Sequence, residues 1–193
     1  TGVGNVGSKL LEQINKQRNY LLEHLRLKIR VIGISNSSKM LLDESSINLN
    51  QWKKLLDKSK TKANKDAFFG HVSQLNLRNS IFIDNTANEI IADEYSRYLS
   101  NNIGVVTCNK IACASTFKNY LYLKKTSRRF GTPFLFETNV GAGLPIIDTL
   151  NNLIASGDKI HKIQAILSGS LNYVFNTFTS KNTFKEVVKS AQD

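Results

Sequence analysis

The chain opens with seven residues that decide how the rest of the fold is interpreted: Thr1-Gly2-Val3-Gly4-Asn5-Val6-Gly7. Their three glycines have the spacing G-x-G-x-x-G, which is typical of the turn between a buried strand and a helix. Apolar residues then recur at helical spacing, at Val6, Leu10, Leu11 and Ile14. The pattern predicts the helix. The strand that should precede the turn is absent from this sequence, so we expect the chain to be part of a longer polypeptide.

If the turn binds a dinucleotide, each of the three positions requires glycine for a different physical reason. Gly2 permits a tight turn, Gly4 lets the backbone approach a pyrophosphate, and Gly7 lets the helix pack closely. The N-terminus of the helix then faces the phosphate charge. A glycine-rich turn without a ligand has the same spacing, so the motif alone leaves both interpretations open.

Short apolar runs alternate with helical patterns in the next hundred residues. We expect strands at 29–34, 81–84, 103–107 and 133–136, loop and a short helix at 40–66, and helices at about 89–100 and 115–128. This alternation predicts an α/β fold, in which a Rossmann-like, doubly wound parallel sheet is covered by helices on both faces.

The pattern changes after Glu137. We expect a helix from Pro145, a longer strand at 160–167, a helix at 171–178, and a last helix that begins with the capping box Thr183-Phe184-Lys185-Glu186. We therefore divide the chain into a first domain at 1–136 and the start of a second, α+β domain at 137–193.

Composition limits the possible classes of protein. The 193 residues are 41% hydrophobic and 21% charged, which excludes general disorder. No apolar run approaches the roughly 18 residues that span a bilayer, and two cysteines make no disulfide framework. We expect a cytoplasmic protein that does not bind a membrane. The net charge of +11 favours anionic partners, but no aromatic residues alternate with the basic ones, so we expect no nucleic-acid binding.

Two loops could hold charged ligands. Residues 35–39 follow the predicted strand at 29–34 with the sequence Ser-Asn-Ser-Ser-Lys, which has no acid for a ribose 2′-hydroxyl. Lys39 and small hydroxyl groups suit a 2′-phosphate better, which favours NADP over NAD. After Glu137, a glycine-bracketed loop frees several carbonyls before Pro145. One carboxylate with carbonyl oxygens suits a hard cation, although a plain strand-to-helix turn has the same pattern.

Four blocks, which occur in one order and together span most of the chain, carry a resemblance to a known family. They are Gly2-x-Gly4-Asn5-Val6-Gly7, Val106-Thr107-Cys108-Asn109-Lys110, the segment from Glu137 to Pro145, and the segment from Ile166 to Asn176. In these blocks the chain resembles homoserine dehydrogenase, and in detail the dehydrogenase part of the bifunctional aspartokinase–homoserine dehydrogenases. The stretch Ile47-Asn48-Leu49-Asn50-Gln51-Trp52 is also similar to the bifunctional type.

The resemblance implies the NAD(P)-dependent interconversion of L-aspartate 4-semialdehyde and L-homoserine, in threonine and methionine biosynthesis. It implies cofactor contacts at Gly2, Val3, Gly4, Asn5, Val6, Gly7, Thr86 and Lys110, substrate contacts at Gly169 and Ser170, and a monovalent cation, usually sodium, at Glu137 and the carbonyls of Val140, Ala142 and Leu144. Lys110 is also the implied catalytic residue, since an ammonium near the substrate carbonyl stabilises a developing alkoxide. A homodimer or higher homo-oligomer, formed through a substrate-binding and dimerisation domain, and an aspartokinase domain on the same chain are further implications.

Two departures from the family pattern matter. Ser170 stands where the family has threonine, which keeps the hydroxyl and loses the methyl group. The family's acidic block, later catalytic aspartate and proton-transferring lysine should follow Asp193. We therefore expect negligible turnover from these 193 residues alone and an active parent enzyme. The alternatives are another NADP-binding protein, such as an aspartate-semialdehyde dehydrogenase with Cys108 as nucleophile, and a regulatory protein that binds a nucleotide without catalysis.

Overall fold

The structure is a computed structural model that describes residues 1–166 and 168–192. It divides into two compact units, of which the first is Thr1–Asn139 and the second begins at Val140. The assignment of cofactor binding to residues 1–136 and of substrate binding to residues 137–193 stays a prediction.

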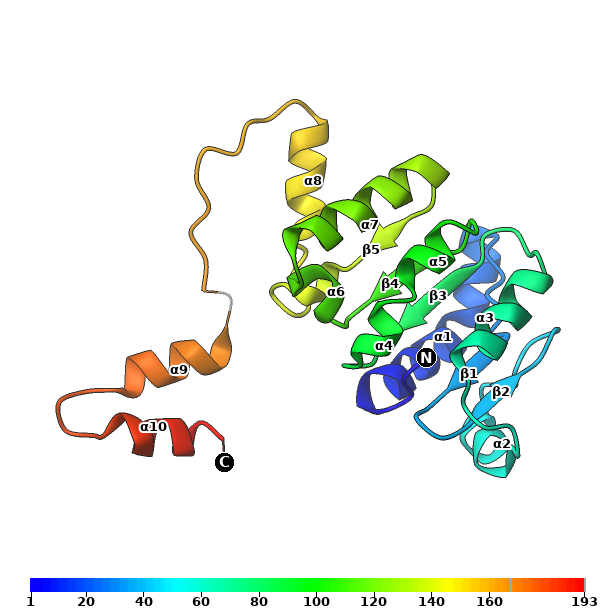
Figure 1. Ribbon diagram of the computed structural model, residues 1–193, viewed down its shortest axis with the longest axis horizontal. Coiled ribbons are helices and arrows are strands. Elements are labelled where there is room, and N and C mark those ends of the chain that lie inside the picture. The colour runs from blue at the N-terminus through cyan, green and yellow to red at the C-terminus, as the bar shows by residue number, and fades with distance from the viewer. Residues whose placement is uncertain (167, 193) are drawn as a thin grey trace. The chain divides into compact units, whose positions relative to one another are not determined.

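A parallel sheet lies at the centre of the first unit. The strands β3 (Ile81–Asp84), β4 (Gly104–Thr107) and β5 (Phe134–Leu135) pair in parallel in the order β3-β4-β5, and Figure 1 shows them as neighbouring arrows. The connecting helices are α4 (Glu89–Ala92) and α5 (Tyr95–Leu99) after β3, and α6 (Ile111–Ala114) and α7 (Phe117–Phe130) after β4. The predicted alternation of strands and helices is confirmed. The single helix predicted at 89–100 is instead two short helices, α4 and α5, and the short helix α6 was not predicted.

The long helix predicted after the glycine turn is confirmed as α1 (Asn5–Leu25). Its apolar face is anchored by Leu11, which belongs to a buried cluster with Ile34, Ile47, Trp52 and Leu56. The helix ends where Arg26 adopts a left-handed conformation and donates its backbone N–H to the Leu21 carbonyl. The opening turn is therefore followed by a rigid element that is fixed to its own core.

The parallel strand predicted at residues 29–34 is wrong in both extent and partner. The observed strand β1 (Gly33–Ser35) pairs antiparallel with β2 (Met40–Leu42) in a separate two-stranded sheet. The Asn36 side chain accepts hydrogen bonds from the backbone N–H groups of Ser38 and Lys39, at 2.8 and 2.7 Å. This side-chain turn reverses the chain and sends β2 back along β1. Two helices follow, α2 (Trp52–Lys58) and α3 (Lys65–Gln74), of which the sequence predicted only a short one.

Aromatic side chains fill the core beneath the parallel sheet. Phe82 of β3 stacks on Tyr98 of α5 with ring centroids 3.9 Å apart, and Phe69 of α3 meets Tyr98 edge to face. Leu99 on the same short helix is fully buried. Helix α5 therefore fixes the position of β3, whose last residue leads into the candidate site.

In the second unit the structure describes three helices: α8 (Ile147–Ala155), α9 (Gly169–Thr177) and α10 (Phe184–Ser190). The predicted capping box is confirmed, because Thr183 and Glu186 exchange both of its hydrogen bonds. The strand predicted at 160–167 is wrong over residues 160–166, which form no strand; Leu167 lies outside the described residues. Ile163 and Ile166 are exposed by 65 and 77%, since a lone extended segment gains no ladder of hydrogen bonds without a neighbouring strand.

Among the described residues, no helix combines the length and the apolar character that a membrane span requires.

Replacement of Leu99 by alanine tests the importance of the aromatic core. Leu99 is fully buried, so Leu99→Ala should lower the free energy of unfolding by about 2–5 kcal/mol. Leu22→Ala is the matched control on α1, where the side chain is 48% exposed, and should change it by less than about 0.5 kcal/mol. Urea unfolding of the two variants makes the comparison, and equal effects would contradict this description of the core.

Candidate functional site

The opening residues lie between the carboxyl ends of two strands that do not pair with each other. Gly2 donates its backbone N–H to the Ser35 carbonyl of β1 at 2.9 Å, and Asn85, directly after β3, donates to the Thr1 carbonyl at 3.0 Å. The carboxyl ends of β3 and β4 meet at the same edge because these strands are parallel. This edge therefore brings the glycine turn, Thr86 and Lys110 into one region of the first unit.

Two of the three glycines are required by close backbone contacts. Gly2 has a φ of +79°, and a Cβ there would lie 2.7 Å from Thr86 Cγ2. A Cβ on Gly7 would lie 1.9 Å from the Gly2 carbonyl oxygen. Gly4 differs, since a Cβ there would meet nothing within 4 Å. The turn is thus tightly packed on one side and open beside Gly4.

The helix that leaves this open side has free N–H groups at its start. Gly4 is the N-cap of α1, no side chain caps it, and no acidic residue lies in the first turn. Unpaired N–H groups and the helix dipole give this end a partial positive charge. Val3 packs against the buried cluster beneath the turn, whereas Asn5 and Val6 are exposed. An open, uncapped helix start without acidic residues fits a pyrophosphate.

Thr86 belongs to a short loop that a buried carboxylate holds in place. Asp84, the last residue of β3, is 0% exposed and accepts the Thr86 backbone N–H at 2.8 Å. The Thr86 methyl group packs against Gly2, where a Cβ would lie only 2.7 Å from it. The Thr86 hydroxyl oxygen accepts the Asn88 backbone N–H at 3.1 Å. Thr86 therefore contacts the glycine turn directly, as the predicted cofactor role requires.

Lys110 follows β4 on the same edge. It precedes the first residue of α6, and its side chain is exposed. In the part of the chain that the structure describes, its ammonium group forms no hydrogen bond or ion pair. The neighbouring Asn109, in contrast, is only 2% exposed and is hydrogen-bonded to Asp84. Lys110 thus places a free positive charge beside a rigid backbone.

The loop between β1 and β2 consists of residues 36–39, which include no carboxylate. Ser37 and Ser38 are exposed there. The ammonium of Lys39 instead donates to the backbone carbonyl of Asp57 at 2.5 Å. A 2′-phosphate at this loop would therefore meet the exposed residues Ser37 and Ser38 at once, and Lys39 only if its ammonium gave up the Asp57 carbonyl.

The other predicted ligands fall into different units. Glu137 begins a 3₁₀ turn at the end of the first unit, whereas Val140, Ala142 and Leu144 belong to the second. Gly141 and Ala142 both have positive φ, 71° and 53°, which turns successive carbonyls of this loop in unusual directions. The predicted substrate residues, Gly169 and Ser170, are exposed in the first turn of α9. That Gly169 and Ser170 lie close to Lys110 stays a prediction.

The two cysteines do not have the character of nucleophiles. Burial raises the pKa of the Cys113 thiol to about 11, and burial together with the charge of Asp84 raises the pKa of Cys108. A thiol nucleophile needs a lowered pKa. Among the described residues, moreover, no three His, Cys, Asp or Glu side chains gather as a metal-binding cluster.

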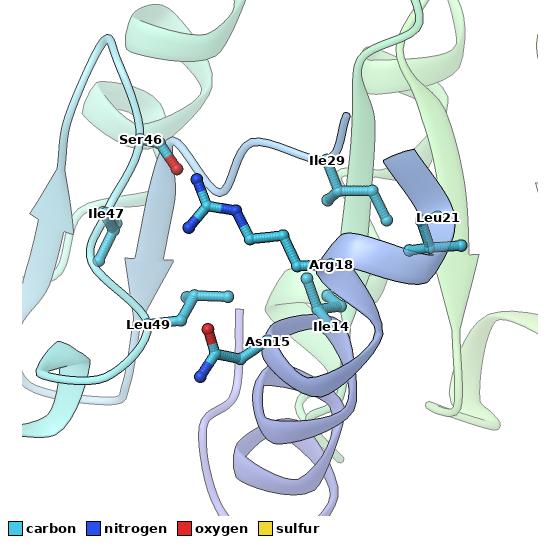
Figure 2. A pocket seen from close by; sticks show the side chains of 8 residues that line it. All are labelled: Ile14, Asn15, Arg18, Leu21, Ile29, Ser46, Ile47 and Leu49. Atoms are coloured by element: carbon cyan, nitrogen blue, oxygen red, sulfur yellow. The ribbon is translucent and has the colours of Figure 1, made fainter. Parts of the chain in front are cut away.

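A surface pocket lies elsewhere on the first unit. Its walls come from the C-terminal half of α1 and from the loop around Ile47, and Figure 2 shows the Arg18 side chain extending across it towards Ser46. The α1 residue nearest to the turn in this pocket is Ile14, ten positions after Gly4, which is about 15 Å along a helix. The pocket is therefore separate from the glycine turn.

Sequence reasoning missed the buried polar residues behind the edge, which are Asp84, Tyr95, Thr107 and Asn109. The tyrosine hydroxyl donates to Asp84 at 2.6 Å and shares a 2.7 Å hydrogen bond with the Thr107 hydroxyl. Burial and the hydrogen bond to Asp84 raise the pKa of Tyr95 well above its usual range. The one available signal was an aspartate at the end of an otherwise apolar strand.

Comparisons with known proteins cover nearly the whole chain. A family model described as "Homoserine dehydrogenase, NAD binding domain" matches residues 2–137, and one described as "Homoserine dehydrogenase" matches residues 145–193. The chain is 40% identical over 193 residues to the maize (Zea mays) bifunctional aspartokinase/homoserine dehydrogenase 2, chloroplastic, covering 100% of this chain and 21% of the relative. It is 36% identical over 198 residues to the homoserine dehydrogenase of Schizosaccharomyces pombe, covering 99% and 52%.

A solved structure shows the same fold. A hyperthermophilic archaeal homoserine dehydrogenase, determined in complex with NADPH, has a TM-score of 0.78 and 23% identity, covering 99% of this chain and 58% of that one. The chain spans about a fifth of the length of the maize relative.

Alanine at two glycines separates packing from ligand binding. Gly7→Ala should destabilise the folded protein by about 3 kcal/mol or more, because its Cβ would overlap the Gly2 carbonyl. Gly4→Ala should leave stability unchanged but weaken NADPH binding about tenfold, since the methyl group occupies the open side of the turn. Thermal unfolding and NADPH fluorescence titration of the full-length protein measure the two effects. Unchanged binding in folded Gly4→Ala would contradict the placement of the pyrophosphate.

Proposed function

The chain belongs to the homoserine dehydrogenase family, and we propose that the full-length protein interconverts L-aspartate 4-semialdehyde and L-homoserine with NAD(P). The observation that carries this proposal is the open, uncapped glycine turn on the same sheet edge as the exposed ammonium of Lys110, which has no partner among the described residues. The raised pKa values of both thiols speak against the aspartate-semialdehyde dehydrogenase alternative, which needs a cysteine nucleophile.

The glycine turn binds and orients the cofactor in this proposal. The free N–H groups at the start of α1 bind the pyrophosphate, and the absence of a Cβ at Gly4 allows the close approach. Thr86 borders the turn through Gly2 and limits where the dinucleotide can lie. The nicotinamide supplies or accepts the hydride when the cofactor is bound.

Lys110 acts on the substrate oxygen. As hydride is added to the carbonyl carbon, negative charge develops on that oxygen, and a nearby ammonium stabilises it. The exposed side chain of Lys110 extends from a backbone that Asn109 fixes on the sheet edge. Gly169 and the Ser170 hydroxyl, at the start of α9, are the proposed substrate contacts of the second unit.

Further proposals concern the surroundings of the site. Glu137 and the carbonyls of Val140, Ala142 and Leu144 have the donor chemistry for a monovalent cation such as sodium. We also propose a homo-oligomer and, from the name of the maize relative, an aspartokinase domain on the same chain. The proposed compartment is the cytoplasm; the maize relative is named as chloroplastic, and microscopy of the tagged full-length protein distinguishes the two.

The activity is tested on the full-length protein with L-aspartate 4-semialdehyde. NADPH oxidation, followed by absorbance, should proceed without added phosphate. Lys110→Met should lower kcat about 10²-fold, the usual effect of removing one stabilising donor. Absence of turnover in the wild-type protein would refute the proposed function. A strict requirement for phosphate would favour the aspartate-semialdehyde dehydrogenase reaction instead.

The preference for NADP is tested at the loop after β1. Lys39→Met should raise the Kd of NADPH about tenfold and that of NADH less than twofold, because a charged hydrogen bond to the 2′-phosphate is lost. Lys58→Met, an exposed lysine at the end of α2, is the matched control and should change neither. An equal rise in the Kd of NADPH and of NADH would show that Lys39 stabilises the fold and does not contact the 2′-phosphate.

The proposed cation is tested with Glu137→Gln. Exchange of sodium for choline in the assay buffer should lower the kcat of the wild-type protein. The glutamine variant lacks the negative charge that attracts the ion, so its lower kcat should no longer depend on sodium. A wild-type activity that is independent of the cation would exclude the site.

A further inference from the structure

Behind the sheet edge, Asp84 is a fully buried carboxylate whose hydrogen bonds come from neutral donors. Its Oδ1 accepts the Thr86 N–H, and its Oδ2 accepts both the Tyr95 hydroxyl at 2.6 Å and the Asn109 side-chain amide at 3.0 Å. A buried charge is costly unless such bonds satisfy it. Its position is therefore held firmly, and so are the groups that bind it.

Asn109 uses every polar atom of its side chain and backbone. Its side-chain amide nitrogen donates to Asp84 and to the Asn88 carbonyl, both at 3.0 Å. Its backbone N–H donates to the Thr107 hydroxyl at 2.8 Å, and its carbonyl accepts the Asn139 side-chain amide at 3.3 Å. Asn109 thus ties together the segments that follow β3, β4 and β5.

The same side chain also fixes the residue after Lys110. Asn109 Oδ1 accepts the backbone N–H of Ile111 at 3.1 Å, at the start of α6. The residues on both sides of Lys110 are therefore restrained: Asn109 by its own hydrogen bonds, and Ile111 by its bond to the Asn109 side chain. The side chain of Lys110 has no such restraint, because it is exposed and unpaired in the described part of the chain.

We propose that Asn109, held by Asp84, is a positioning residue that sets where the Lys110 ammonium meets the reacting carbonyl. The proposal rests on the proposed function. Its physical reason is that a shift of about 1 Å in a reacting group can cost about 10²-fold in rate. The carboxylate thus acts at the site through Asn109 and touches no substrate itself.

The matched control is Tyr95→Phe. It removes the bonds of the Tyr95 hydroxyl to Asp84 and to the Thr107 hydroxyl within the same buried network, yet it leaves every bond of Asn109 in place. The test variant is Asn109→Ser, whose hydroxyl can still accept the Ile111 N–H but is too short to reach Asp84. If Asn109→Ser does not fold, Asp84→Asn serves in its place, since it turns an acceptor of the Asn109 amide into a competing donor.

A double-mutant cycle on the full-length protein provides the first readout. Asn109→Ser should lower kcat about tenfold with the Kd of NADPH within about threefold, and Tyr95→Phe should keep kcat within about twofold of the wild type. In a Lys110→Met background, Asn109→Ser should cost less than about twofold, because the residue through which it acts is gone. An equal cost with and without Lys110 would overturn the proposal, and so would equal losses in the serine and phenylalanine variants.

Amide hydrogen exchange provides a second readout that needs no activity. Asn109→Ser should speed exchange in peptides that cover residues 108–112, and Tyr95→Phe should leave those peptides unchanged. Exchange that is unchanged in the serine variant would overturn the proposal. If the wild-type protein lacks homoserine dehydrogenase activity, the proposed function fails, while the exchange result still decides whether Asn109 fixes the backbone at Lys110.

Discussion

The opening turn depends on a backbone contact that is closer than any side chain allows. Gly7 packs directly on the Gly2 carbonyl, and Gly2 packs against Thr86. The start of α1 is therefore in close contact with the loop after β3. Gly4, between them, faces open space. Because the packed glycines fix the helix start, its free N–H groups have a defined direction, and a pyrophosphate can bind there without rearrangement of the turn.

A second constraint links this turn to the part of the sheet edge that carries Lys110. Asp84 holds the Thr86 loop through one carboxylate oxygen and the Asn109 loop through the other. The cost of burying a charge is offset by hydrogen bonds that position both loops. Thr86 and Lys110, which are proposed to act on the cofactor and the substrate, are therefore both positioned by the Asp84 side chain.

The sequence predicted those features that local signals determine. The helix after the glycine turn, the capping box at Thr183 and the strand that ends at Asp84 each have their signal within a few residues, and the structure contains all three. The antiparallel partner of β1 depends on bonds made by the Asn36 side chain, and residues 160–166 lack a strand partner in the described structure, so both expectations failed. The Asp84–Asn109 bond joins residues 25 positions apart, which periodicity cannot reveal.

The central claim is that the dinucleotide lies across the start of α1. A crystal structure of the full-length protein with NADPH tests it directly. We predict pyrophosphate oxygens within hydrogen-bonding distance of the N–H groups in the first turn of α1, above the open face of Gly4, with the nicotinamide directed towards Lys110. A cofactor bound elsewhere, with this helix start left to solvent, would contradict it.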